Sequence, residues 1–378
     1  MGARPCAMEG VAMTSLAEFY RGKRVLLTGH TGFKGSWLAL WLTRMGALVT
    51  GFALLPEHGE RSLFYAAGVE SMTKSHIGDI RDRAAILAVV RESDPEIVIH
   101  NAAQALVCRS YADPFGTYET NVMGTVNVLE AVRQSKSVRS AVVVTTDKCY
   151  ENREWYWAYR EVDRLGGHDP YSSSKACAEL VTASYRSSFF GKEDQPATST
   201  VRAGNAIGGG DWAEDRLVPD IARAIASGLP VAIRNPTSTR PWQHVLEPLR
   251  GYLMLAQAQW GRKSLAGAWN FGPSGAGLTV QELAARMISY WGSGTMAVLD
   301  EEAPAPHEAH TLRLDNSKAG VELGWRPILS FDESVRMTAE WYRAYLADPR
   351  AGADLTLNQI ETYVNRLATG VSAAGGSD

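Results

Sequence analysis

Apolar residues in the first half of the chain follow two alternating patterns, short continuous runs and longer stretches with helical spacing. The continuous runs predict strands over residues 25–27, 48–54, 97–99, 141–145 and 198–202. The helical spacing predicts helices over residues 84–91, 120–134, 170–190 and 216–227. Strands that are apolar throughout and alternate with helices are typical of a parallel sheet covered on both faces. We therefore predict an α/β fold built on a Rossmann-type, doubly wound parallel sheet.

Three glycines at a spacing of three residues follow the first predicted strand and open a helical stretch. Glycine at these points lets the backbone turn sharply, approach a diphosphate closely and pack the helix on the strand, while the helix N-terminus offers N–H groups. The pattern predicts a dinucleotide cradle, although an ordinary strand-to-helix loop can have the same spacing. The candidate cofactor residues of this turn are Gly29, Thr31, Gly32, Phe33, Lys34 and Gly35.

Further cofactor candidates follow the other strands, because ligands of such sheets bind at the carboxyl ends of the strands. These candidates are Asp79, Ile80, Ala102, Ala103, Gln104 and Asn121. Any one of these polar segments could simply be a turn. Several of them at the ends of successive strands are harder to explain in that way. An acidic residue that binds the adenosine ribose of NAD is expected at the end of the second strand, but the first acid there is Glu57. Arg61, four residues later, could bind the 2′-phosphate of NADP. The residues themselves therefore leave NAD and NADP both open.

Two segments hold candidate catalytic chemistry. Tyr171 and Lys175 share one face at the start of the predicted helix over residues 170–190. A neighbouring cation lowers the pKa of a phenol toward the range in which it acts as a base. Alternatively, the two residues have no catalytic role, and Tyr171 is half-buried beside a solvated Lys175. Thr146 and Asp147 follow the fourth predicted strand, where Thr146 can donate to a reacting oxygen. Asp147 either acts as a general acid, if burial raises its pKa, or caps the turn.

Composition narrows the choice of partners. The chain has 378 residues, 45% of them hydrophobic, and a net charge of −3, which favours small molecules over nucleic acid or a membrane. It has no apolar run of transmembrane length and no CxxC pair, so we expect a soluble cytoplasmic protein without disulfides. His307-Glu-Ala-His310 is one residue short of the HExxH zinc pattern, and no metal site is predicted. Residues 1–13 and 370–378 are expected to be disordered.

Together these motifs carry a family resemblance. Gly29-x-x-Gly32-x-x-Gly35, Thr146 and Tyr171-x-x-x-Lys175 resemble the extended short-chain dehydrogenase/reductase family, which works on nucleotide sugars with a retained nicotinamide cofactor. Longer runs are similar to the CDP-sugar 4,6-dehydratases of that family, among them GHTGFKGSWL, TDKCYENREW, GGHDPYSSSKACAELV and RPWQHVLEPL. The resemblance implies NAD as the cofactor and CDP-D-glucose as the substrate, with CDP-4-dehydro-6-deoxy-D-glucose as the product.

The resemblance also implies roles for the catalytic candidates. Tyr171 would take the proton of the 4-hydroxyl as C4 is oxidised, and Asp147 would protonate the hydroxyl that leaves C6. The dTDP-glucose relatives have an acidic residue at the position of Lys148, where it removes the C5 proton. Here either Lys148 or Glu151 is the candidate base, and an ammonium at Lys148 could instead stabilise the enolate.

Finally, the resemblance implies a division of the chain. Residues 14–202 with 243–273 would form the NAD-binding domain, and residues 203–242 with 274–350 a smaller substrate-binding domain. Asn205, Arg216 and Arg240 would contact the substrate, and the Arg240 guanidinium suits a diphosphate unless it lies in a surface ion pair. Relatives form homodimers through the helices after the third and fourth strands. Another nucleotide-sugar dehydratase, an epimerase, a decarboxylase and a non-catalytic NAD sensor are the alternatives.

Overall fold

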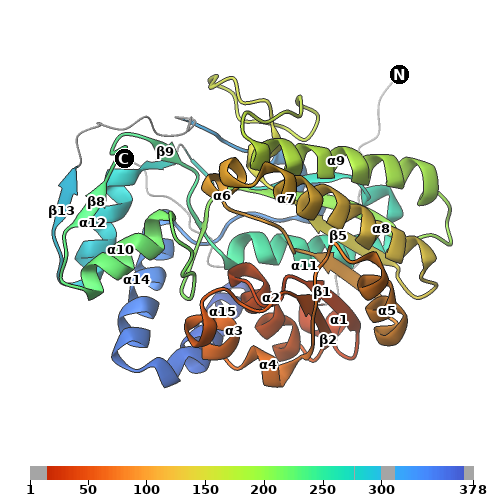
Figure 1. Cartoon of the computed structure of the whole chain (residues 1–378), viewed down its shortest axis with the longest axis horizontal. Helices are drawn as coiled ribbons and strands as arrows, with labels where there is room; N and C mark the ends of the chain where they lie inside the picture. The colour runs from red at the N-terminus through yellow and green to blue at the C-terminus, as the bar shows by residue number, and fades with distance from the viewer. Residues whose placement is uncertain (1–14, 276, 299–310, 370–378) are drawn as a thin grey trace.

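A seven-stranded parallel sheet forms the centre of the computed structural model, which describes residues 15–275, 277–298 and 311–369. The strands run in the order β11-β6-β5-β4-β1-β2-β3 (Figure 1). They are β1 (Arg24–Thr28), β2 (Leu48–Ala53), β3 (Lys74–Ile77), β4 (Ile97–His100), β5 (Ser140–Val144), β6 (Ala197–Ala203) and β11 (Ala268–Phe271). The chain winds outward in both directions from the junction of β1 and β4, which confirms the predicted Rossmann-type fold.

Helices cover both faces of this sheet, because successive residues of each strand point to opposite sides. Val25 and Leu27 of β1 belong to one hydrophobic core, whereas Leu26 between them belongs to the other. The larger core packs under α1 (Leu16–Tyr20), α2 (Phe33–Arg44), α3 (Leu63–Ala66), α4 (Val69–Met72), α11 (Leu246–Gly261) and α15 (Gly352–Ala368). The smaller core packs under α5 (Arg83–Ser93), α8 (Gly124–Gln134) and α9 (Pro170–Phe189).

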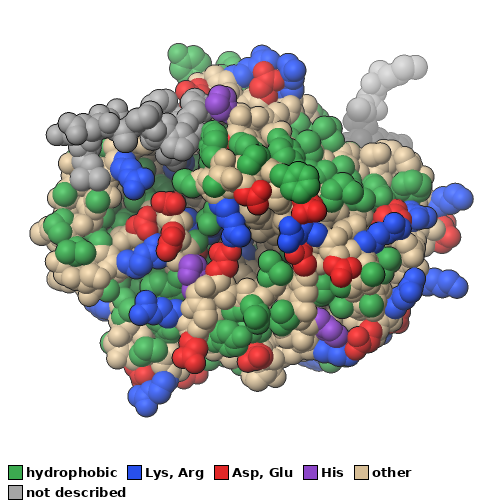
Figure 2. Space-filling model, viewed as in Figure 1, with side chains coloured by type: hydrophobic (Ala, Val, Ile, Leu, Met, Phe, Trp, Pro, Cys, Tyr) green, Lys and Arg blue, Asp and Glu red, His purple; other side chains and the backbone are tan. Residues whose placement is uncertain are grey.

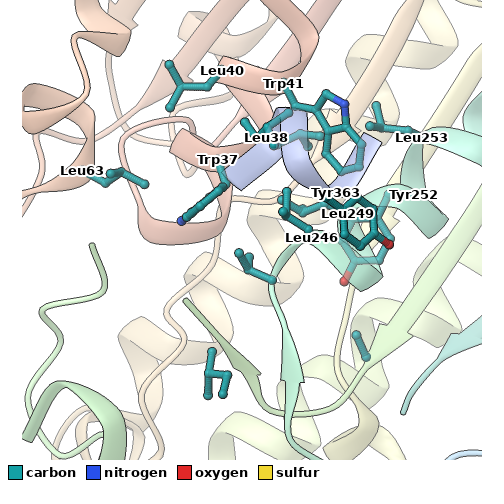
Figure 3. Packing of buried hydrophobic residues seen from close by; sticks show 14 of the residues in the cluster. Trp37, Leu38, Leu40, Trp41, Leu63, Leu246, Leu249, Tyr252, Leu253 and Tyr363 are labelled. Carbon is teal, nitrogen blue, oxygen red and sulfur yellow. The ribbon is translucent and has the colours of Figure 1, made fainter. Parts of the chain in front are cut away.

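The larger core joins parts of the chain that are far apart in sequence. Figure 3 shows Trp41 of α2 beside Tyr363 of α15 and Leu249 of α11, whereas Trp37 of α2 points away from these two residues. The Trp41 and Tyr363 rings meet edge to face with centroids 5.7 Å apart. Each such buried side chain stabilises the fold by about 1.5–3 kcal/mol. The C-terminal helix is thereby fixed to the helix that follows the glycine turn.

Two elements differ from the expected pattern. The predicted helix over residues 120–134 begins with a π-helical turn, η2 (Glu119–Met123), before α8 starts at Gly124. Strand β3 is polar, with the sequence KSHI, because it lies at the edge of the sheet, where β2 is its single neighbour among the described strands. An edge strand of this kind leaves no continuous apolar run in the sequence.

The remaining elements lie beside the large sheet. Figure 1 places α10, α12, α14, β8 and β13 together at the left of the view, beyond the carboxyl ends of the central strands. The helices of this part are α10 (Leu217–Ala226), α12 (Val280–Trp291) and α14 (Phe331–Ala347), whereas α13 (Ser317–Leu323) packs against β11 and α11. Its short strands are β7 (Ala206–Ile207), β8 (Val231–Ile233), β9 (Thr239–Arg240), β10 (Gln243–His244), β12 (Leu278–Thr279) and β13 (Met296–Val298). Short helices α6 (Val107–Ala112), α7 (Pro114–Tyr118), η1 (Gly59–Arg61), η3 (Asp147–Cys149), η4 (Lys263–Leu265) and η5 (Pro349–Ala351) complete the fold.

Several sequence expectations concern features outside these elements. No helix within the described ranges is both long enough and apolar enough to cross a lipid bilayer. No disulfide joins the cysteines of the described part of the chain, of which Cys149 is buried. His307-Glu-Ala-His310 and residues 1–13 and 370–378 lie outside the described residues. Among the residues that are described, no group of His, Cys, Asp or Glu is placed to hold a metal ion.

Candidate active site

The predicted dinucleotide cradle is a tight turn between β1 and α2, which we call the cofactor turn (residues 29–35). Gly29 has a φ of +74°, and a Cβ added there would lie 2.7 Å from the backbone nitrogen of Ala102. A Cβ on Gly35 would lie 2.0 Å from the carbonyl oxygen of Gly29. Gly32, the N-cap of α2, has no side chain to occupy the first N–H groups of the helix. The turn therefore fits a dinucleotide, because it presents bare backbone and a helix N-terminus to an anion.

The side chains of the cofactor turn are arranged around this backbone. The Thr31 hydroxyl donates to the carbonyl oxygen of Leu54 at 2.9 Å, so it ties the turn to the end of β2. Phe33 lies under Gly208, where an added Cβ would approach its ring to 3.3 Å. Burial, with a contribution from Arg216, lowers the pKa of Lys34 to about 8. Lys34 consequently carries a charge that is poorly solvated and open to stabilisation by an anion.

The strand-end candidates Gln104 and Asn121 hold one another in place. The Asn121 Oδ1 accepts from the Gln104 backbone N–H at 2.9 Å, and Nδ2 donates to the Gln104 carbonyl at 3.0 Å. The same Nδ2 donates to the Ser174 hydroxyl on α9 at 2.9 Å. The π-helical turn thus fixes the loop after β4, including Ala102 and Ala103, against the helix that carries the candidate tyrosine.

Asp79 and Ile80 follow β3 at the far end of the candidate cofactor site. Three nitrogen atoms of Arg81 donate to the Asp79 carboxylate at 2.6–3.0 Å, and these bonds lower the pKa of Asp79. Ile80 is buried, and its carbonyl oxygen accepts from the Asn127 side chain at 3.0 Å. Asp79 is therefore an ionised acceptor at the edge of the sheet.

Sequence reasoning missed His30, which fills the space beside the second strand. His30 is fully buried, and its Nε2 lies 2.7 Å from the Ser75 hydroxyl. A Cβ on Gly51 would lie 2.2 Å from the His30 ring, so the glycine in β2 makes room for the imidazole. Burial lowers the pKa of His30 to about 4, and the ring is neutral at physiological pH. The pairing of a histidine after Gly29 with a glycine in β2 is the signal in the sequence.

The catalytic candidates come from two neighbouring elements. Thr146 and Asp147 lie in the segment that follows β5, which we call the catalytic turn (residues 145–150). Tyr171 and Lys175 lie in the first two turns of α9, which begins after the N-cap Asp169. A hydrogen bond joins Tyr171 to Thr146, and the Thr146 hydroxyl donates to Asp147 Oδ1 at 3.0 Å. The structure thus brings the phenol, the hydroxyl and the carboxyl group together.

Burial sets the proton affinities of these groups. It raises the pKa of Tyr171 to about 12, against the lowering effects of the Thr146 hydrogen bond and of Arg216. It also raises the pKa of Asp147, against the lowering effects of Lys148, Thr146 and Lys34. Asp147 could act as a general acid only if its pKa were raised, and burial raises it.

Lys175 lies against the end of β5. Its Nζ donates to the carbonyl oxygen of Val144 at 2.9 Å, and burial lowers its pKa to about 8. Arg216, the N-cap residue of α10, lowers the pKa of Tyr171. Sequence spacing placed Lys175 on the correct helix face but did not reveal this partner from another part of the chain.

The two candidates for the C5 base have different surroundings. The Glu151 carboxylate lies 2.7 Å from Arg164 and 3.2 Å from Arg153. Lys148 is partly exposed, next to the buried Asp147. Arg153 and Arg164 thus pair with the Glu151 carboxylate, whereas Lys148 shares the catalytic turn with the general acid candidate.

The substrate candidates approach the same place from the other side. A Cβ on Gly204 would lie 3.2 Å from Asp147 Oδ2 and 2.8 Å from Pro241, so the residues beside Asn205 and Arg240 border the catalytic carboxyl. Arg240 is buried and donates to the Thr239 carbonyl at 3.0 Å. These contacts bring both segments to the catalytic turn.

Asp211, which sequence reasoning did not single out, fixes Arg216. Its Oδ2 lies 2.8 Å from the Arg216 guanidinium, and its backbone carbonyl accepts from the Tyr342 hydroxyl. Arg216 is therefore held in place before any ligand binds. The signal in the sequence is an acid five residues before the arginine at the end of the glycine-rich run.

A Rossmann sheet with a glycine cradle, and a Tyr-x-x-x-Lys helix beside a threonine, together define a nicotinamide-dependent enzyme of the short-chain dehydrogenase/reductase class. The comparison with protein families is more specific. The GDP-mannose 4,6 dehydratase family matches residues 26–338, and the chain belongs to this family.

Individual relatives narrow the comparison further. A CDP-glucose 4,6-dehydratase from Salmonella typhimurium is 50% identical over 336 residues, which cover 87% of this chain and 93% of that protein. The crystal structure of the dTDP-glucose 4,6-dehydratase DesIV from Streptomyces venezuelae with NAD has a TM-score of 0.73 and 25% identity, covering 85% of this chain and 97% of that one. A UDP-glucose 4-epimerase from Thermus thermophilus in complex with NAD also gives a TM-score of 0.73, with 28% identity and coverage of 85% and 99%.

Proposed function

We propose that this protein is a hydro-lyase that dehydrates CDP-D-glucose to CDP-4-dehydro-6-deoxy-D-glucose. The observation that carries the proposal is 50% identity to a CDP-glucose 4,6-dehydratase along nearly the whole chain. The site supports it, because a buried carboxyl with a raised pKa lies beside the Thr146 and Tyr171 pair. An epimerase needs a base at C4 but has no need for such an acid at C6.

NAD is the cofactor, and it supplies the chemistry of taking a hydride from C4 and returning it to C6. The cofactor turn would hold the diphosphate through Gly29, Gly32 and Gly35, because any side chain at Gly29 or Gly35 would close the cradle. Around the turn, the residues assigned to the cofactor are Thr31, Phe33, Lys34, Asp79, Ile80, Ala102, Ala103, Gln104, Asn121, Tyr171 and Lys175. Asp79 and Ile80 would contact the adenosine end, since they follow β3 at the edge of the sheet.

Tyr171 acts as the base for the 4-hydroxyl. Its pKa is raised to about 12 by burial, so it needs positive charge nearby to ionise. Arg216 supplies one such charge, and the bound cofactor supplies another. Thr146 orients the phenol through their hydrogen bond and is placed to donate to the oxygen at C4. Lys175 would hold the cofactor ribose and orient it toward Tyr171.

Asp147 is assigned to C6 and Lys148 to C5. The protonated Asp147 carboxyl gives its proton to the hydroxyl that leaves C6 as water. Lys148, beside Asp147 on the catalytic turn, is assigned to the C5 proton, which the ketone at C4 has made acidic. We favour Lys148 over Glu151, because Arg153 and Arg164 hold the Glu151 carboxylate.

The substrate would lie between the two parts of the chain. We propose that residues 14–202 with 243–273 form the NAD-binding domain and that residues 203–242 with 274–350 form the substrate-binding domain. Arg216 and Arg240 then face the CDP diphosphate, and Asn205 binds the substrate beside them. The ion pair of Arg216 with Asp211 supports this role, since the guanidinium is oriented in advance.

We propose that the protein is a homodimer in the cytoplasm. Figure 2 shows hydrophobic side chains gathered over α6, α7 and α9. This surface includes Tyr111, Phe115, Met123 and Leu180, which are 43%, 77%, 51% and 59% exposed. Apolar surface of this kind favours burial against a second copy of the chain. The absence of disulfides among the described cysteines suits a reducing compartment.

Isotope transfer tests the proposed reaction. Incubation with NAD and CDP-glucose carrying deuterium at C4 should give a product that is lighter by one water and carries the deuterium in its new methyl group. Tyr171→Phe should lower kcat about 10²–10⁴-fold, because it removes the base. A product of unchanged mass would contradict dehydration. Turnover of the UDP or dTDP sugar in preference to CDP-glucose would contradict the proposed substrate.

A further inference from the structure

A buried carboxylate joins the catalytic helix to the end of strand β5. Glu179 lies on α9 one turn after Lys175, and it is 3% exposed. Its Oε1 accepts from the Thr145 hydroxyl at 2.5 Å, and its Oε2 accepts from the Thr200 hydroxyl of β6 at 2.6 Å. The Arg202 guanidinium adds two donors, with Nε at 2.9 Å and Nη2 at 2.8 Å. Glu179 therefore connects α9, β5 and β6 at one point.

Arg202 extends the same network to the other end of the catalytic turn. Its Nη1 donates to the Tyr150 hydroxyl at 2.7 Å, and its guanidinium lies 4.8 Å from the centre of the Tyr150 ring. The Tyr150 hydroxyl in turn donates to Asn270 Oδ1 at 2.8 Å. Since Thr145 and Tyr150 are the first and last residues of the catalytic turn, the network holds both ends of the segment that presents Asp147.

A buried ion pair of this kind is weak evidence for stability. Removing two charges from water costs about as much as their attraction returns, and packed apolar side chains of similar volume often stabilise a core equally well. A fully bonded polar network instead fixes the relative positions of the elements that it joins. Burial raises the pKa of Glu179, but Arg202 and the two threonines outweigh this effect and keep the carboxylate ionised.

We propose that Glu179 and Arg202 are positioning residues that set the distance between Tyr171 on α9 and Thr146 and Asp147 on the catalytic turn. Neither residue is among those assigned above to the substrate or the cofactor. Their effect is on the alignment of the two proton-transfer groups, for which a displacement of about 1 Å can cost 10²-fold in rate. This inference deepens the proposed function and rests on its assignment of Tyr171 and Asp147.

The chain offers a matched control in a second buried carboxylate. Glu247 of α11 is 1% exposed and accepts from the backbone N–H groups of Ile328 at 2.8 Å and Leu329 at 2.7 Å. It also accepts from the Tyr363 hydroxyl at 2.7 Å and lies 3.9 Å from Arg250. These partners join α11 to the C-terminal part of the chain and include no residue of the catalytic turn or of α9.

The experiment compares Glu179→Gln with Glu247→Gln in the full chain with NAD. Both variants should lower Tm, because each leaves a buried arginine without its carboxylate. At a temperature where both are folded, Glu179→Gln should lower kcat about 10–100-fold with little change in KM. Glu247→Gln should retain the wild-type kcat. An unchanged kcat in Glu179→Gln, or an equal loss of kcat in both, would overturn the proposal.

A milder pair of variants serves if Glu179→Gln does not fold. Thr145→Val removes one donor to Glu179, whereas Thr145→Ser keeps it. The valine variant should lower kcat, and the serine variant should restore most of it; equal activity of the two variants would refute positioning through this bond. Wild-type turnover of CDP-glucose tests the proposed function separately, because the ratios between variants can be measured with whichever nucleoside diphosphate glucose the protein converts.

Discussion

The cofactor turn and the catalytic turn follow β1 and β5, two strands of one sheet that β4 separates, but the two turns are built in different ways. The cofactor turn works through its backbone, which comes close to itself where Gly35 meets the Gly29 carbonyl oxygen and leaves no room for a side chain at either position. The catalytic turn works through side chains whose partners are remote, since Thr145 bonds Glu179 at a separation of 34 residues and Tyr150 bonds Asn270 at 120. A change in the first turn is therefore a steric event that affects folding and binding together. A change in the second alters rates within an intact fold.

The largest effect should follow from Gly35→Ala in the cofactor turn. Its Cβ would lie 2.0 Å from the Gly29 carbonyl oxygen, which the backbone cannot move without opening the turn. We expect a loss of roughly 3 kcal/mol or more in the free energy of unfolding, together with loss of NAD binding. Denaturant unfolding and titration with NAD measure the two effects.

Gly32→Ala is the matched control for this prediction. The added Cβ would be 3.5 Å from the Gly29 oxygen, an ordinary contact, and the φ of −80° suits alanine. Stability should change by less than about 1 kcal/mol, while NAD affinity falls because the methyl group faces the diphosphate. If both variants unfolded at the same denaturant concentration as wild type, the steric account of the turn would be wrong.

Asp147→Asn tests the catalytic turn, with a smaller and more selective effect. The amide has nearly the shape of the carboxyl but cannot give a proton to the leaving hydroxyl. Dehydration should slow about 10²–10⁴-fold. Oxidation at C4 depends on Tyr171 and should persist, so near-ultraviolet absorbance of reduced nicotinamide should build up in a single turnover. Equal slowing of oxidation and dehydration would assign Asp147 to the fold rather than to the elimination.

The same contrast explains what the sequence could predict. The cofactor turn and the Tyr171-Lys175 pair are local patterns, in which spacing alone determines which residues share a turn or a helix face. The partners of Arg216 and Glu179 depend on contacts between distant segments, and no periodicity indicates them. The same holds for the bond of Lys175 to Val144, since helical spacing places a lysine on a face but not against a particular carbonyl.

The strands show the same limit. Buried β1, β2, β4, β5 and β6 lie within a residue or so of the predicted ranges, because their apolar runs reflect burial on both faces. Strand β3 pairs with a single neighbour and is only partly buried, so its polar sequence predicts a strand weakly. The π-helical turn at η2 was missed, because a single π-helical turn within a helix leaves no clear pattern in the sequence.

Lys34 is where the two turns meet, and its replacement should give the smallest effect. It belongs to the cofactor turn, yet its charge lowers the pKa of Asp147 in the catalytic turn. Burial lowers the Lys34 pKa to about 8, from about 10.4 in an unfolded chain. Below about pH 8 the folded protein therefore carries the full cost of a poorly solvated charge. Between about pH 8 and 10.4 the folded state loses its proton first, and this cost is relieved as pH rises.

Lys34→Met should consequently stabilise the protein without NAD by about 1 kcal/mol at neutral pH, a reduced value because the side chain is partly exposed. The gain over wild type should shrink as pH rises from about 8 toward 10. Lys23→Met, which removes a lysine 3.4 Å from Glu96 at the surface, should give no such gain. Denaturant unfolding at neutral and alkaline pH compares the three proteins. A gain in stability that does not depend on pH would mean that the variant is stabilised by better packing and not by loss of the buried charge. A gain in stability that shrinks as pH rises would mean that the Lys34 charge destabilises the free protein. The cofactor turn would then be less stable in exchange for a cation near both the diphosphate and the catalytic carboxyl.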